Sequence, residues 1–73
     1  MTLYEFNSLE EDSRFTYLWE FGVYLDSVIM QSIRINLYAI NMFFVEVHYD
    51  AKTNAIKDIQ TFKHGHMIDK YIN

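Results

Sequence analysis

Three segments in the middle of this chain alternate apolar and polar residues with a period of two. Residues 23–26 begin the pattern, and residues 33–39 and 43–49 repeat it. Such alternation is typical of β-strands, because successive side chains point to opposite faces of a sheet. The links between the segments are too short for the crossover that parallel strands require. The pattern therefore predicts an antiparallel β-meander.

A turn and a fourth strand are predicted next. The segment 50–54 is rich in turn-forming residues: Asp50 can accept local backbone hydrogen bonds, and Asn54 tolerates a left-handed conformation. We expect it to close a hairpin into a strand at about residues 55–62. The apolar residues of that strand fall three apart, which predicts a bulge or strong twist near residues 57–58. A short helix is the competing interpretation.

Helices are expected at both ends of the chain. Ser8 and Glu11 have the spacing of a capping box, which predicts a helix over about residues 9–21 that ends at a left-handed Gly22. Its expected core stripe consists of Phe15, Leu18 and Trp19. A short terminal helix is predicted from the apolar residues Met67, Ile68, Tyr71 and Ile72.

Together these elements predict one α+β domain over residues 1–73. Its order is an N-terminal helix, a four-stranded antiparallel β-meander and a short C-terminal helix, with both helices on one face of the sheet. A hydrophobic content of 51% is ample for a folded core.

Composition excludes several classes of function. The absence of cysteine removes disulfides, thiolate zinc sites and cysteine nucleophiles. A net charge of −4 disfavours nucleic acid and anionic membranes as partners, and two isolated glycines cannot form a phosphate-binding loop. The acidic start lacks the basic region of a secretory signal, and no apolar run reaches membrane-spanning length. We therefore expect a cytoplasmic protein without a cofactor.

Two histidine patterns could carry chemistry. The His64-Gly65-His66 motif is the most metal-like, yet only His48, Asp58 and Asp69 are available to complete a site, so we interpret it as a surface loop without metal. Glu46 and His48 lie two apart on one strand face and could form an acid–base pair. On an exposed face such pairs are usually solvated, and exchange of either residue for Ala is expected to change stability little. We predict no enzymatic activity.

The expected open sheet face, opposite the helices, is the preferred interaction surface. Its candidate residues are Tyr24, Arg34, Asn36, Tyr38, Phe44, Glu46 and His48. Aromatic and Arg side chains are enriched in protein interfaces, although a half-wet sheet face would have a similar mixture. Residues 28–30 add an apolar connection, which is either an exposed tip for a partner or a continuation of the first strand into the core, with the turn nearer residues 31–32.

The segments LYEFNSL, LWEFGVYL and FFVEVHYDAKTNAIKDIQTF, ahead of the tail IDKYI, resemble a group of small bacterial proteins of helix, four-stranded meander, helix type. The resemblance runs through almost the whole chain and implies the same compact fold. The group has no established activity, so the resemblance carries no catalytic residue to this sequence.

The sequence thus favours a non-enzymatic protein–protein interaction or assembly module, and we expect a homodimer formed through the open sheet face or the strand edges. The alternative is a small-molecule-binding regulatory domain. Its expected pocket lies between the first helix and the sheet and is lined by Tyr17, Trp19, Phe21 and Tyr24.

Overall fold

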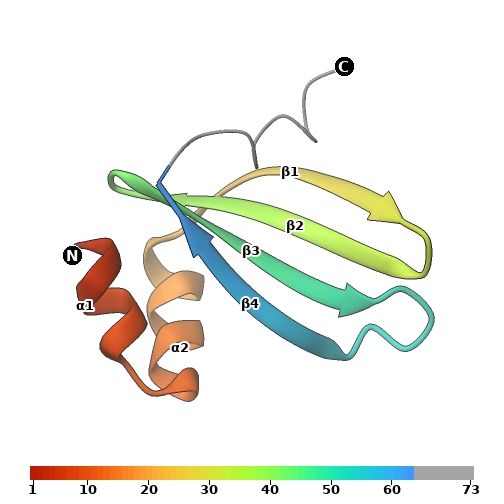
Figure 1. The fold of residues 1–73 in the computed structure, drawn as a ribbon, viewed down its shortest axis with the longest axis horizontal. Coiled ribbons are helices and arrows are strands. Elements are labelled where there is room, and N and C mark those ends of the chain that lie inside the picture. Colours follow the sequence, from red (N-terminus) through yellow and green to blue (C-terminus); the bar gives the residue numbers. More distant parts are fainter. Residues whose placement is uncertain (64–73) are drawn as a thin grey trace.

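The computed structural model describes residues 1–63 and has two short helices followed by an antiparallel sheet (Figure 1). The elements are α1 (Leu3–Ser8), α2 (Glu11–Phe21), β1 (Val23–Met30), β2 (Ile33–Ile40), β3 (Phe43–Asp50) and β4 (Ile56–Phe62). The four strands lie side by side in sequence order. The predicted α+β class and the antiparallel meander are confirmed. The predicted C-terminal helix lies outside the described residues.

The helix predicted over about residues 9–21 is α2, which begins at Glu11, and it is preceded by a second helix, α1, that was not predicted. The capping box is at the start of α1: the Glu5 amide donates to Thr2 Oγ1 at 3.1 Å, and the Thr2 amide donates to Glu5 Oε1 at 2.7 Å. The box predicted at Ser8 is wrong. The Ser8 hydroxyl instead donates to the Tyr4 carbonyl, at 2.8 Å, within α1.

Both helices pack on one face of the sheet. The core is formed by six buried side chains from helices and strands: Phe6, Leu18, Ile40, Phe43, Val45 and Val47. Phe6 of α1 lies 5.5 Å from Phe43 between ring centroids. Of the stripe predicted for α2, Leu18 is buried and Phe15 packs at the margin, but Trp19 is 51% exposed. The helix end that carries Trp19 therefore lies at the edge of the core.

The turn between β2 and β3 decides which side chains share a face. Asn41 and Met42 form a two-residue connection, so Ile40 lies directly opposite Phe43 and Tyr38 opposite Val45. Asn41 has the positive φ, 50°, that tight hairpin turns require. Because opposite residues point to the same side, even-numbered residues of β2 share the helix-covered face with odd-numbered residues of β3.

The face opposite the helices is also buried in part. Leu37 of β2 lies opposite Glu46 of β3, and both are almost completely inaccessible to solvent. Ile35 and Phe62 on the same face are also buried. The centre of this face is therefore closed to solvent, and it is not the fully open interaction surface that the sequence predicts.

Two bulges interrupt the ladder. In β4, His48 pairs with Asp58 and Tyr49 with Ile56, so Lys57 is the extra residue. This confirms the bulge predicted near residues 57–58 and rules out the short helix. In β1 the register shifts between Tyr24 and Asp26, which makes Leu25 an extra residue that the sequence analysis did not anticipate.

β1 continues through residues 28–30, and the turn to β2 is at Gln31–Ser32, so the longer strand is confirmed. Burial of Met30 in the core is wrong, however, because Ile29 and Met30 are 70% and 50% exposed. The strand ends that carry the β1–β2 and β3–β4 turns project beyond the two helices (Figure 1), which explains this exposure.

Gly22 ends α2 with extended backbone, φ −74° and ψ 141°, and not in the predicted left-handed conformation. Glycine is needed for space: a Cβ would lie 2.6 Å from the Leu18 carbonyl oxygen and 2.8 Å from Leu18 Cδ1.

We predict that Gly22→Ala lowers the free energy of unfolding by about 1–3 kcal/mol, because Leu18 belongs to the core and cannot move freely. Chemical denaturation measures this change. Asn54→Gly, at a position with φ 63°, is the control and should change stability little.

The turn after β3 is stabilised by the Asp50 carboxylate, which accepts hydrogen bonds from the Lys52 and Thr53 amides at 2.8 and 3.1 Å. The backbone amides of Thr53 and Lys52 lower the pKa of Asp50. A carboxyl group with a lower pKa in the folded state stabilises the fold above its unfolded pKa, about 3.9, and this contribution is lost as the pH falls through the folded value.

We predict that the stability of Asp50→Asn falls less steeply than that of the wild type as the pH drops below about 4. Thermal melts across acid pH test this, and an unchanged slope would contradict it.

Candidate functional site

The seven residues of the predicted interaction surface lie on two different faces. Strand register places Tyr24, Tyr38, Asn36 and Arg34 on the helix-covered face, with partners that include Val45 and Val47. It places Phe44, Glu46 and His48 on the opposite face, paired with Ala39, Leu37 and Ile35. The expectation that the seven share one face is therefore wrong. Across the two-residue turn an even-numbered residue of β2 lies opposite an odd-numbered residue of β3, so even-numbered residues of the two strands point to opposite faces. The alternation within each strand does not show this.

On the helix-covered face, aromatic rings form a cluster that leads from the core to the β1 edge. The Tyr38 ring packs edge-on against Trp19 and Tyr24, with centroid distances of 5.7 and 5.8 Å. Tyr38 also packs against the core, whereas Trp19 and Tyr24 are about half exposed. The Tyr24 hydroxyl lies 2.5 Å from Ser27 Oγ, which donates to Asn36 Oδ1 at 2.7 Å. These contacts hold two exposed rings in fixed positions beside β1.

Farther along this face, Arg34 lies over the Tyr49 ring, with its guanidinium carbon 4.8 Å from the ring centroid. Burial raises the pKa of the Tyr49 hydroxyl, and the nearby Tyr38 raises it further. Tyr49 therefore stays protonated at neutral pH. Arg34 and Tyr49 form a cation–π contact in the part of the sheet that lies beyond the helices. Arg34 is engaged within the fold.

On the opposite face, Glu46 and His48 do form the predicted pair, with His48 Nε2 3.1 Å from Glu46 Oε1. Glu46 is fully buried and the His48 side chain is 17% exposed, so the pair is not on a solvated surface. Beside it, Asp58 lies opposite His48. A hydrogen bond from Gln60 lowers the pKa of Asp58, as do the Ile59 amide and the nearby His48. Glu46 and His48 thus form a hydrogen-bonded pair on this face that is largely shielded from solvent.

Exposed apolar side chains gather at the end of α2 and along β1, and the sequence did not predict this group. We define the β1 surface by seven side chains that are 46–70% exposed: Trp19, Phe21, Val23, Tyr24, Leu25, Ile29 and Met30. They come from the end of α2 and both ends of β1. A signal was available, because the first strand of a meander is always an edge strand, where apolar residues are not enclosed by a neighbour.

The two edges of the sheet differ in chemistry. β4 presents Lys57 and Asp58 at its bulge, and charged residues and bulges are devices that protect an edge from pairing with another chain. β1 has the sequence VYLDSVIM, in which Asp26 is the single charged residue. Beyond the bulge at Leu25, the stretch Asp26–Met30 pairs regularly with β2. Among residues 1–63, no strand pairs with the outer side of β1, and the protective features of this edge are the bulge at Leu25 and the charge of Asp26, both in its first half.

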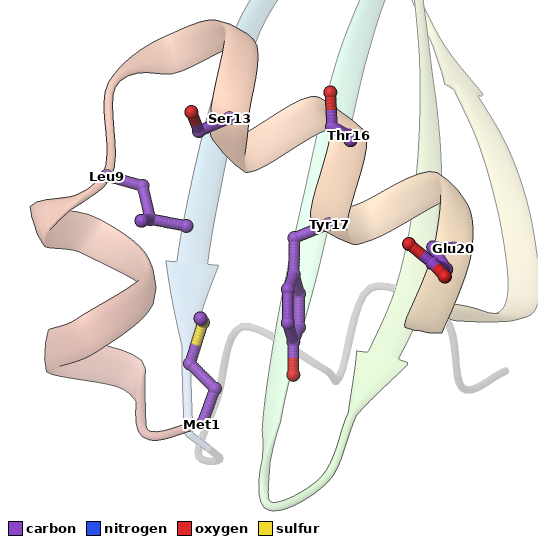
Figure 2. Close-up of a pocket in the computed structure, with 6 residues that line it drawn as sticks. All are labelled: Met1, Leu9, Ser13, Thr16, Tyr17 and Glu20. Atoms are coloured by element: carbon purple, nitrogen blue, oxygen red, sulfur yellow. The ribbon is translucent and has the colours of Figure 1, made fainter.

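A pocket of about 310 Å³ lies between α1 and α2 (Figure 2). Its lining residues are Met1, Leu9, Ser13, Thr16, Tyr17 and Glu20. The side chains of Met1 and Leu9 are directed toward the Tyr17 ring in Figure 2. This is not the pocket predicted between the first helix and the sheet: of the four residues expected to line that pocket, only Tyr17 lines this one.

Across residues 1–63, no three His, Cys, Asp or Glu side chains gather into a group that could hold a metal ion. The His64-Gly65-His66 motif lies outside the described residues. Among the same described residues there is no helix with the length and hydropathy to cross a membrane.

No protein-family model, curated protein or solved structure matches the chain. The resemblance to small bacterial proteins of the helix, meander, helix type therefore stays a prediction. What can be said of the site rests on its own geometry.

The burial of Glu46 changes the expectation for its replacement. We predict that Glu46→Ala lowers the free energy of unfolding by about 2–4 kcal/mol, because it leaves a cavity beside Leu37 and removes the partner of His48. Denaturant titration measures the loss. Gln60→Ala, at the exposed position opposite Glu46 on β4, is the matched control and should stay within about 0.5 kcal/mol of wild type. Equal effects of both variants would mean that Glu46 is not part of the packed interior.

Proposed function

We propose that this protein is a non-enzymatic interaction module that assembles through its β1 surface. The observation that carries the proposal is the exposure of seven large apolar side chains beside a strand edge whose second half, residues 27–30, is regular and uncharged. These side chains lie on both faces of β1, with Tyr24 and Ile29 on the helix-covered face and Val23 and Met30 on the other. Exposed apolar side chains gathered along an edge are a common mark of an interaction site.

The composition of the β1 surface supports this function. Trp and Tyr are over-represented among the residues that contribute most to binding, and Trp19 and Tyr24 are held in place by Tyr38. Rigid rings lose little conformational entropy when a partner covers them. The surface therefore has anchors that are already positioned for binding.

The non-enzymatic part of the proposal rests on the acid–base residues. Glu46 is closed to solvent, and its one described histidine neighbour, His48, is turned toward it. A general base must reach a substrate proton directly or through one water. This pair serves the stability of the sheet better than it serves a reaction.

A second candidate function, binding of a small molecule, is favoured by the pocket between α1 and α2. Its apolar side is formed by Met1 and Leu9 and its polar side by Ser13, Thr16 and Glu20. A volume of about 310 Å³ is at the lower end of the range for ligand pockets. A ligand-binding monomer would gain thermal stability with added ligand and show no dependence on its own concentration, whereas an assembling module shows that dependence.

The proposed assembly is tested at Ile29, the most exposed apolar residue of β1 at 70%. We predict that the apparent mass of the wild-type protein, measured by light scattering, rises with concentration, and that Ile29→Lys weakens association by at least about tenfold. The lysine must desolvate its charge in the interface, and a two-fold interface contains the change twice.

Met42→Lys is the matched control, since Met42 is 86% exposed in the β2–β3 turn and the substitution adds the same charge. It should associate as the wild type does. The fluorescence of Trp19, the single tryptophan of the chain, reports coverage of the β1 surface. At high protein concentration a covered Trp19 should be less accessible to a dissolved quencher. A wild type that stays monomeric with Trp19 fully accessible at every concentration would contradict the proposed function.

A further inference from the structure

We infer that the partner at the β1 surface is a second copy of this chain, and that the two β1 strands pair antiparallel about a two-fold axis through Val28. The result is one continuous eight-stranded sheet. The inference rests on the proposed function and adds to it the identity of the partner and the mode of contact.

Strand pairing suits this edge because β1 has eight residues and, among the residues that the structure describes, no strand on its outer side. An edge strand has backbone N–H and C=O groups that another strand can satisfy. β1 contains no proline, lysine or arginine, and its one charged residue, Asp26, and its bulge at Leu25 leave Ser27–Met30 as a regular uncharged stretch. The charged, bulged β4 edge is much less suited to it.

The β1 bulge limits the possible registers. It leaves Asp26–Met30 as the regular stretch, in which Asp26, Val28 and Met30 point to one face and Ser27 and Ile29 to the other. A two-fold axis perpendicular to the sheet keeps each residue on its own face, so it must pass through a residue and not between two. The axis through Val28 is the one that pairs all five residues.

The side chains brought together by this axis are compatible. Val28 meets Val28, Ile29 meets Ser27, and Met30 meets Asp26 across the new interface. An axis through Asp26 would place two carboxylates directly opposite each other, which is destabilising. The register about Val28 keeps the two Asp26 side chains apart.

The exposed area is of the size that a dimer needs. Each half-exposed ring of Trp19, Phe21 and Tyr24 presents on the order of 100 Å². With the four aliphatic members of the β1 surface, the available area approaches the roughly 800 Å² per partner of a standard interface. Strand pairing alone covers the edge, and the rings at the end of α2 extend the contact on the helix side.

Disulfide trapping tests this geometry, because the chain contains no cysteine of its own. In Val28→Cys the two thiols face each other across the axis, with Cα atoms about 4.5–5.5 Å apart, a separation that a disulfide accepts. With oxidised glutathione as the oxidant, we expect a covalent dimer to form at least about tenfold faster than in Met42→Cys, since paired thiols have a far higher effective concentration.

A second measurement does not depend on the folding of one variant. A mixture of Ser27→Cys and Ile29→Cys should give the mixed disulfide in preference to either homodimer, because Ser27 lies opposite Ile29 only in this register. Cross-linking of Val28→Cys no faster than that of Met42→Cys, together with no preference in the mixture, would overturn the inference. If the wild type still associates in light scattering, the proposed function survives that result. If it is monomeric, both fall.

Discussion

The pairing of β2 with β3 sets the face of every side chain in the sheet. Ile40 lies opposite Phe43 across a two-residue turn, and this contact places Tyr38 beside Val45 and Asn36 beside Val47. A shift of one residue would exchange the two faces and expose the core side chains. The helices depend on the same register, because Phe6 and Leu18 pack on the surface that it creates.

A small chain can enclose only part of its apolar residues, and this protein encloses them around β2 and β3. Val45 and Val47 on one face and Leu37 and Glu46 on the other are almost fully buried. The helices lie against one end of the sheet, with α1 beside β4, and the far end of β1 projects beyond them (Figure 1). The large side chains of β1 therefore remain in solvent because the core has no further room and not because their sequence is unusual. A partner chain is the natural source of the missing coverage.

The same arrangement separates the two kinds of polar residue in the sheet. Glu46 and His48 lie in the packed interior, where their mutual hydrogen bond stabilises the ladder. Ser27, Asn36 and Tyr24 form a chain of hydrogen bonds near the β1 edge and fix the orientation of the Tyr24 ring. Polar groups thus support both the interior and the position of the exposed aromatic rings.

Local sequence patterns determined the elements of this protein. Alternation determined the strands, Asp50 and Asn54 the last turn, and the three-residue spacing of Ile56, Ile59 and Phe62 the bulge in β4, because each depends on neighbours in the chain. Tertiary structure alone decided which face each strand presents, the burial of Glu46, the packing of α1 onto the sheet and the exposure of Trp19 and β1. Those features depend on register and on competition for a small core, and both are set by contacts between residues far apart in the sequence.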